Sequence, residues 1–235
     1  MRITPKPATL LASAVIAGAL ALSGCTAAAD APASTPEIST PGSAAPANVE
    51  GFGIAAGTGP VEVALWTDLS CPYCALLEAD TGELLAAWVD SGDITLTIHP
   101  LNFVSAKRGD DTDWSTRAAN ALAAAADAGH TDAVPALYAL LQQNQVSDAG
   151  APTDEEILAL AAQAGVTGDI SDAVTSQRFS GWVTASNDHW LGSTIEGTEQ
   201  VVQGVPILVV DGAVFEIQET NAARLRAAVE AALAG

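Results

Sequence analysis

Two cysteines separated by two residues, in the motif Cys71-Pro72-Tyr73-Cys74, carry the clearest chemistry in this sequence. Such a pair can close a small disulfide, or both sulfurs can bind one metal ion. A helical pattern follows Cys71, so this sulfur lies beside unsatisfied backbone N–H groups and the positive end of a helix dipole. Both favour the thiolate and lower the pKa of Cys71 below the free value of about 8.5. We therefore expect Cys71 to be an exposed nucleophile and Cys74, one turn into the helix, to be the resolving thiol.

Two other uses of the cysteine pair are a zinc site and a disulfide that only holds the fold together. A structural zinc ion takes four ligands. The sequence has no second cysteine pair, and its histidines, at 99, 130 and 189, lack ligand spacing. A disulfide across so short a loop restrains little of the unfolded chain, so it adds little stability. We expect redox chemistry without a metal or a cofactor.

The segments around the motif alternate between strand and helix patterns. Strand patterns cover 61–66, 94–98, 206–210 and 213–217, with a hairpin turn at Asp211-Gly212 between the last two. Helical patterns follow Cys71 to about Asp90, cover 115–128 and 133–143, begin again at Thr153, continue over 169–191 and close the chain from about Thr220. About a hundred residues separate the second strand from the third, far more than a crossover needs. We predict an α/β fold, a mixed sheet flanked by helices, with an all-helical subdomain inserted at about 113–192.

The N-terminal segment has the composition of an export signal. Arg2 and Lys6 precede an almost unbroken apolar stretch from Ala8 to Leu22. This stretch is shorter than the roughly 20 residues that span a bilayer, so it favours a signal peptide over a stable anchor helix.

The apolar stretch ends in Leu22-Ser23-Gly24-Cys25, which resembles the bacterial lipobox. In that motif the cysteine is acylated and becomes the first residue of the mature protein; the alternative is a plain signal peptide with a chance cysteine near its end. We expect a signal peptide over 1–24, lipidation of Cys25 and a folded domain over 51–235. The intervening residues, 25–50, are mostly Ala, Pro, Ser and Thr, which predicts a flexible tether.

The formal net charge of −20 limits the partners of the chain. Nucleic-acid binding depends on Lys and Arg that neutralise phosphates, so nucleic acid is not an expected partner. Anionic lipid headgroups would also repel the chain, so a membrane attachment must be covalent or hydrophobic. These features predict a protein anchored by lipid to the cell membrane and facing the extracytoplasmic side.

The motif and its surroundings resemble the bacterial DsbA-like thioredoxin-fold oxidoreductases. The resemblance rests on Cys-Pro-Tyr-Cys after a strand, on Asp68-Leu69-Ser70 before it, on the helical insertion, and on Gly204-Val205-Pro206 before the penultimate strand. It covers the chain from about residue 60 to the C-terminus. It implies a thioredoxin-like fold in which Pro206 is the cis-proline beside the active-site disulfide and the backbone of Val205 pairs with substrate peptide. An ordinary trans proline at the first residue of a strand is the alternative.

One residue of the motif departs from the strongly oxidising members of that family. They typically carry His where this chain has Tyr73, and a tyrosine supplies no positive charge. The same four-residue motif also occurs in glutaredoxins, which lie near −200 to −230 mV, against about −120 mV for DsbA. Pro72 and Tyr73 are thus expected to modulate the reactivity of the two sulfurs, and the chain to be a milder oxidant than DsbA.

The sequence therefore predicts an enzyme that forms or exchanges disulfides in exported proteins, together with a membrane redox partner. The same residues serve oxidation and reduction, and the direction depends on the partner and the potential. The alternative from a different class is a lipid-tethered binding module or chaperone whose disulfide is structural.

Overall fold

The computed structural model of the chain describes residues 44–235. The expected signal peptide, Cys25 and most of the expected tether lie outside the described residues. Among the helices within the described part, none is long and apolar enough to cross a membrane.

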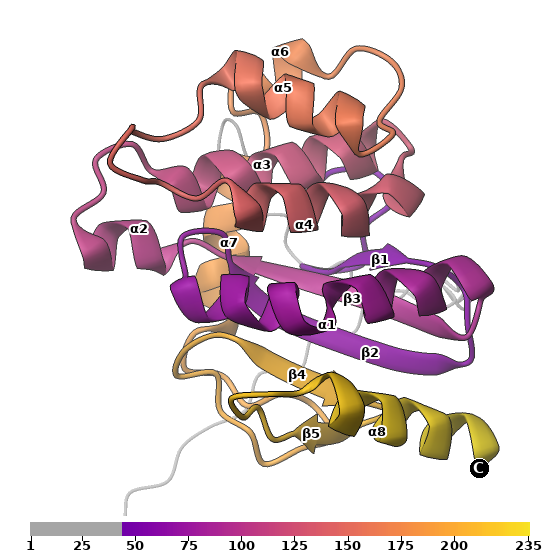
Figure 1. The fold of residues 1–235 in the computed structure, drawn as a ribbon. Helices are drawn as coiled ribbons and strands as arrows, with labels where there is room; N and C mark the ends of the chain where they lie inside the picture. The colour runs from indigo at the N-terminus through magenta and orange to yellow at the C-terminus, as the bar shows by residue number, and fades with distance from the viewer. Residues whose placement is uncertain (1–43) are drawn as a thin grey trace, which may run out of the picture. The chain divides into compact units, whose positions relative to one another are not determined.

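Five strands form one mixed sheet in the order β1-β3-β2-β4-β5 (Figure 1). They are β1 (Ile54–Ala56), β2 (Val61–Asp68), β3 (Ile94–Leu101), β4 (Ile207–Val210) and β5 (Ala213–Phe215). The central strands β2 and β3 run parallel, with Val61 opposite Ile94, whereas β4 is antiparallel to β2. The expected α/β class, with a mixed sheet, is confirmed.

The helices lie before, within and after a long insertion into this sheet. They are α1 (Pro72–Ser91), α2 (Phe103–Arg108), α3 (Trp114–Asp127), α4 (Val134–Gln143), α5 (Asp154–Gln163), α6 (Ser171–Thr175), α7 (Ser180–Trp190) and α8 (Ala222–Ala234). The six from α2 to α7 all separate β3 from β4 in the chain, and Figure 1 shows α3 to α6 stacked beyond the β1 edge of the sheet. The insertion therefore begins earlier than the expected residue 113. It starts with the six-residue helix α2, which is too short to show a helical pattern of apolar residues in the sequence.

Alternation along β2 divides the sheet into two buried faces. Val63 and Leu65 belong to the main core, to which α1 and α8 contribute. Trp66, one position further on, points to the opposite face and packs in a smaller cluster with Leu101 and, at its edge, Trp190 of α7. The period of two in this strand thus places α1 on one side of the sheet and α7 on the other.

Helix α1, which carries both cysteines, has defined ends. Pro72 occupies its first turn, where the missing N–H has no partner to lose. Gly92 ends it in the left-handed conformation (φ 76°), and its N–H bonds the carbonyls of Trp88 and Val89. The start of the helix, and with it the position of Cys71, is fixed by these local features together with the end of β2.

The packed domain begins a few residues before position 51. The Ala47 N–H donates to Asp127 Oδ1 at 2.8 Å, and Asn48 Nδ2 donates to the Ala126 carbonyl at 3.0 Å. The last residues of the expected tether therefore contact the C-terminal end of α3.

His99 lies in an aromatic cluster on the α7 side of the sheet. Its ring stacks on Trp66 with 4.5 Å between centroids, and Trp190 meets it edge-on at 4.9 Å. Burial lowers the pKa of His99 to about 4, against a backbone hydrogen bond with the Phe52 carbonyl that raises it. The folded state therefore holds this ring neutral at pH values where the unfolded chain protonates it.

The His99→Gln variant tests this pH dependence. Because the folded pKa lies below the ordinary value of about 6.5, the contribution of His99 to stability is complete above pH 6.5 and is lost as the pH falls towards 4. We expect the wild-type protein to lose up to about 3 kcal/mol more than the variant over this range. Urea denaturation at several pH values measures the difference; parallel curves for the two proteins would contradict it.

Candidate active site

The cysteine motif lies where β2 ends and α1 begins. The Cys71 N–H donates to the Asp68 carbonyl at 3.0 Å, which closes the turn through Leu69 and Ser70. Cys71 is the N-cap of α1, with extended backbone angles, and Cys74 lies in the first helical turn. The expected position of the two cysteines at a strand-to-helix junction is confirmed.

The two sulfurs differ in burial, and Cys71 is more covered than the sequence indicates. Cys71 keeps 5% of its surface exposed and Cys74 none, so the expectation of an exposed Cys71 needs correction. The cover comes from Val104 of α2 and from two partly buried neighbours, Phe103 and Val205. These residues are distant in sequence, which is why a local motif could not indicate them.

The loop before β4 reaches the first sulfur. Cys71 Sγ donates to the Val205 carbonyl at 3.5 Å, and the Val205–Pro206 peptide bond is cis. The cis bond agrees with what the family resemblance implies for Pro206. Both residues are half-buried, so the backbone beside Cys71 remains within reach of the surface.

The environments of the two sulfurs move their acidities in opposite directions. The Cys74 thiol donates to the Cys71 sulfur and, with backbone N–H groups of Cys74 and Tyr73, lowers the pKa of Cys71 to about 7 despite partial burial. Burial and the neighbouring Cys71 raise the pKa of Cys74. Near neutral pH the negative charge therefore resides on Cys71, as expected, although the largest single cause is the second thiol rather than the helix backbone.

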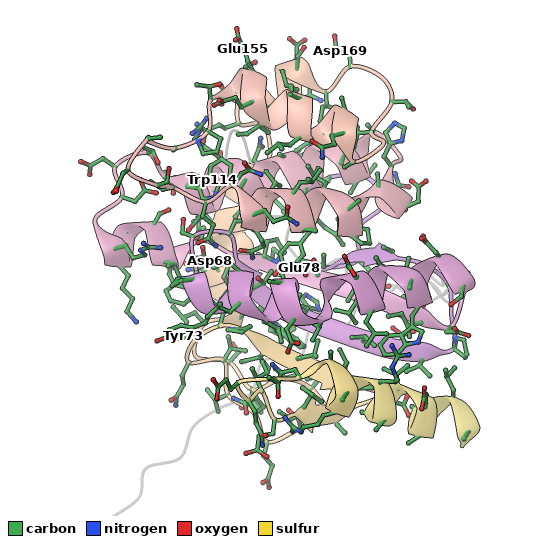
Figure 2. The ribbon with its side chains drawn as sticks, viewed as in Figure 1. Asp68, Tyr73, Glu78, Trp114, Glu155 and Asp169 are labelled. Atoms are coloured by element: carbon green, nitrogen blue, oxygen red, sulfur yellow. The ribbon has the colours of Figure 1, made fainter. Side chains whose placement is uncertain are left out.

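Tyr73 contributes no charge to this arrangement. Its side chain is 69% exposed, and Figure 2 shows it at the end of α1 that carries the motif, directed away from the sheet. Tyr73 acts on Cys71 through its backbone N–H, which is one of the groups that lower the pKa of that sulfur.

Asp68 connects the motif to the helical insertion. Its carboxylate accepts from the Ser70 N–H and from the Val104 N–H of α2, both at 2.9 Å, and from the Ser115 hydroxyl of α3. Burial raises the pKa of Asp68 to about 6, and these hydrogen bonds oppose the rise. The carboxylate holds α2 against the turn that precedes Cys71.

Helix α4 supplies a second set of contacts that the sequence analysis missed. The Tyr138 hydroxyl lies 2.7 Å from Thr67 Oγ1, and Gln142 Nε2 donates to the Tyr138 oxygen at 3.0 Å. Gln145, just after α4, donates to the Cys71 carbonyl at 3.0 Å. Nothing in the sequence pattern singles out these side chains, because their role depends on how the insertion folds back over the motif.

The remaining expected site features are placed as follows. Cys25 lies outside the described residues. Within residues 44–235, no three His, Cys, Asp or Glu side chains gather so that they could hold a metal ion. The described site therefore consists of Cys71, Cys74, the residues between them and the Val205–Pro206 backbone.

The chain matches the model of the family described as Thioredoxin over residues 53–231. No curated protein sequence matches it. Among solved structures, the reduced disulfide bond oxidoreductase DsbG of Mycobacterium tuberculosis is similar, with a TM-score of 0.64 and 22% identity over 77% of this chain and 87% of that one.

Two further structures share this architecture. Oxidised DsbA of M. tuberculosis aligns with a TM-score of 0.64 and 21% identity, covering 78% of this chain and 93% of its own. The thiol-disulfide oxidoreductase MdbA of Corynebacterium matruchotii aligns with a TM-score of 0.59 and 17% identity, covering 75% and 88%. These similarities show a DsbA-like thioredoxin fold with its helical insertion.

The Asp68→Ala variant tests the role of the buried carboxylate. It leaves the buried N–H groups of Ser70 and Val104 without their acceptor, so we expect the free energy of unfolding to fall by about 2 kcal/mol. The pKa of Cys71 should also fall, because the Asp68 charge raises it. Denaturant titration and thiol titration measure the two effects.

Asp111→Ala is the matched control, since Asp111 is exposed in the loop after α2. Equal stability of the two variants would show that the Asp68 contacts do not hold the site together.

Proposed function

The chain belongs to the thioredoxin family, and from this premise we propose that it is a membrane-anchored, extracytoplasmic thiol–disulfide oxidoreductase acting on exported proteins. It is an enzyme of the DsbA-like type, and its reacting groups are the sulfurs of Cys71 and Cys74. The observation that carries the proposal is the contrast between these sulfurs. Cys71 has a lowered pKa and lies beside the half-buried Val205–Pro206 backbone, whereas Cys74 has no exposed surface and a raised pKa.

This contrast determines the order of the chemical steps. A substrate thiolate attacks the sulfur of Cys71 in the Cys71–Cys74 disulfide, because Cys74 is out of reach. The Cys71–Cys74 bond breaks, Cys74 leaves with the electron pair, and a mixed disulfide joins the substrate to Cys71. A second substrate thiolate then attacks the substrate sulfur, and Cys71 leaves as a thiolate stabilised by its low pKa. The substrate is oxidised and the enzyme reduced; the reverse sequence reduces a substrate disulfide.

The backbone beside Cys71 offers a place for the substrate chain. The Val205 carbonyl lies within reach of the Cys71 sulfur, and no hydrogen bond to the Val205 N–H is found within residues 44–235. An extended peptide can pair with such a backbone segment as an added strand. Pairing there would hold a substrate cysteine next to Cys71.

The exposed apolar side chains beside the motif fit unfolded substrates. Tyr73 and Leu76, in the first turns of α1, are 69% and 66% exposed. Exposed apolar surface of this kind marks interaction sites. Chains that have just been exported and are not yet folded present apolar segments that could contact both residues.

The membrane attachment and the compartment are supported by the sequence alone. The export signal and the lipobox-like Leu22-Ser23-Gly24-Cys25 point to a lipidated Cys25. Lipidation of this cysteine leaves Cys71 and Cys74 as the pair available for redox chemistry in an oxidising compartment. A redox partner in the membrane would restore their oxidation state.

The Cys71→Ser variant tests the proposed activity. We expect it to abolish both insulin reduction with dithiothreitol and refolding of a reduced disulfide-containing substrate, since the attacked sulfur is gone. The matched Cys74→Ser variant should instead accumulate a mixed disulfide with substrate at Cys71, visible by mass spectrometry. Activity unchanged in Cys71→Ser would leave the binding module or chaperone with a structural disulfide as the function.

The redox potential tests the role of Tyr73. Without a positive charge at this position, we expect an equilibrium titration against glutathione to give a potential well below the value of about −120 mV for DsbA. Tyr73→His should raise the potential, because a cationic ring favours the Cys71 thiolate and hence the reduced state. For this two-electron couple, each 30 mV change in the potential corresponds to about 1.4 kcal/mol in the free energy of reducing the disulfide.

Tyr73→Phe is the control for the change of side chain and should leave the potential unaltered. A wild-type potential near −120 mV would show that the oxidising power does not depend on histidine at this position.

A further inference from the structure

Arg108 is a cation beside the motif that has no acidic partner in the described part of the chain. It lies at the C-terminal end of α2, the helix that covers Cys71, and Figure 1 shows α2 beside the start of α1. Neither of the two ion pairs found within residues 44–235 includes Arg108. The chain has 28 acidic and 8 basic side chains, so acidic partners are abundant and the free charge of Arg108 requires a reason.

The Arg108 guanidinium is held at the turn that precedes Cys71. Its Nη1 donates to the Ser70 carbonyl at 2.8 Å. The Ser70 hydroxyl lies 2.7 Å from Ser105 Oγ of the same helix, so two contacts fix α2 to this turn. A guanidinium carries five N–H donors, and the bond to Ser70 uses one of them. Because Ser70 directly precedes Cys71, the free donors are presented beside the residue that reacts.

A cavity of about 300 Å³ lies between this guanidinium and the loop that follows α4. It is lined by Ser70, Arg108, Gly109, Asp110, Asp111 and Val146. Its volume is at the lower end of the range of small-ligand pockets, so it fits a substrate side chain or a small molecule. Val146 follows Gln145, whose side chain bonds the Cys71 carbonyl, so the cavity borders the motif through both of its walls.

The two carboxylates that line the cavity differ in their hydrogen bonds. Asp110 Oδ1 accepts from the N–H and the hydroxyl of Thr112. Its Oδ2 accepts from the Ser105 hydroxyl and from the Trp114 N–H. Asp111 is exposed, and no hydrogen bond to its carboxylate is found within residues 44–235. Asp110 is therefore committed to its own loop, whereas Asp111 opposes the entry of a further negative charge.

We propose that Arg108 binds a carboxylate of the thiol substrate while the substrate sulfur reacts at Cys71. A guanidinium offers a carboxylate parallel N–H donors, in a geometry that an ammonium group does not provide. The chemical step is the one described above: the substrate thiolate attacks the Cys71 sulfur, and Cys74 leaves with the electron pair. Arg108 takes no part in making or breaking bonds. It is a specificity-determining residue, and its role rests on the proposed function.

The overall charge of the protein gives such a residue a function. A formal net charge of −20 repels an anionic substrate. The substrate must nevertheless attack as a thiolate, because the protonated thiol is not the nucleophile. A cation beside Cys71 offsets the repulsion at the place where the thiolate and a neighbouring carboxylate come together. The carboxylate can belong to a small thiol or to an acidic residue near the cysteine of a protein.

The Arg108→Gln variant tests the inference with three small thiols as probes. Mercaptopropionate carries a carboxylate, mercaptoethanol carries no charge, and cysteamine carries an ammonium group. Acid quenching, alkylation and mass spectrometry measure the rate at which each thiol opens the Cys71–Cys74 disulfide. Each rate is divided by the wild-type rate for the same thiol, so that differences in thiol acidity and nucleophilicity cancel.

We expect only the thiol that carries a carboxylate to react much more slowly with Arg108→Gln. The rate with mercaptopropionate should fall by about fivefold, the factor that an ion pair at the upper end of the surface range supports. The rates with mercaptoethanol and cysteamine should change by less than about twofold, because they have no carboxylate for the guanidinium to bind.

Three further variants separate carboxylate binding from other effects of the substitution. Lys107→Gln removes the same charge from an exposed neighbour that does not line the cavity, so it should behave as the wild type with all three thiols. Asp111→Asn removes the opposing carboxylate and should raise the rate with mercaptopropionate alone. Arg108→Lys keeps the charge but loses the planar fork, so it should restore only part of the wild-type rate.

A pair of cysteine peptides identifies the source of the carboxylate. The peptides carry Glu or Gln two residues after the cysteine, since alternate residues of an extended chain lie on the same side. Slower reaction of Arg108→Gln with the Glu peptide, but not with the Gln peptide, assigns the carboxylate to protein substrates. Slower reaction with mercaptopropionate but with neither peptide assigns it to a small thiol.

The outcomes distinguish this inference from the function on which it rests. Equal slowing of all three thiols in Arg108→Gln would show a structural role through the Ser70 carbonyl, and no slowing would show no role; either result overturns the carboxylate site. The oxidoreductase activity stands in both cases, because mercaptoethanol still opens the disulfide of the wild type. If no thiol opens a disulfide at Cys71 in the wild type, the proposed function falls, and the carboxylate site falls with it.

Discussion

The structure depends on one asymmetry: the sulfurs of Cys71 and Cys74 lie in different environments although they belong to the same four-residue motif. Cys71 caps α1, where the Cys74 thiol and backbone N–H groups favour its thiolate. Cys74 enters the same helix and is sealed completely, so its thiolate is disfavoured. A disulfide between such sulfurs opens in one direction only, with attack at Cys71 and departure of Cys74. This difference is set by the end of β2, the turn after it and the start of α1. Together these three segments form the functional unit of the protein.

The helical insertion maintains this unit. Helix α2 covers Cys71 with Val104 and is held to the motif turn by the Asp68 carboxylate. Helix α4 provides Tyr138, whose hydroxyl hydrogen-bonds Thr67. Gln145, two residues after the end of α4, donates to the Cys71 carbonyl. In Figure 1 the insertion lies along α1, and its residues Val104 and Gln145 contact Cys71 directly. A motif of four residues thus requires contacts with residues as far as 134 positions away in the chain.

Much of the fold could be predicted from the sequence because its signals are local. The period of two in β2 and β3, Pro72 and Gly92 at the ends of α1, and the capping box of Thr153 and Glu156 all confirm expected elements. Three features could not be predicted from the sequence, because each depends on tertiary packing: the short helix α2, the residues that cover Cys71 and the contact of Gln145 with Cys71. The burial of Glu78 could have been predicted from the sequence. Its position falls on the face of α1 that also carries Leu77 and Leu85, and a charged residue is unusual on such a buried face.

Alkylation of the folded, reduced protein with iodoacetamide across the pH range, with each cysteine quantified by mass spectrometry, tests the asymmetry most directly. We expect Cys71 to react with a midpoint near pH 7, whereas Cys74 should stay unmodified until the protein is denatured. Reaction of Cys71 with the midpoint of a free cysteine, about 8.5, or no faster than Cys74, would contradict it.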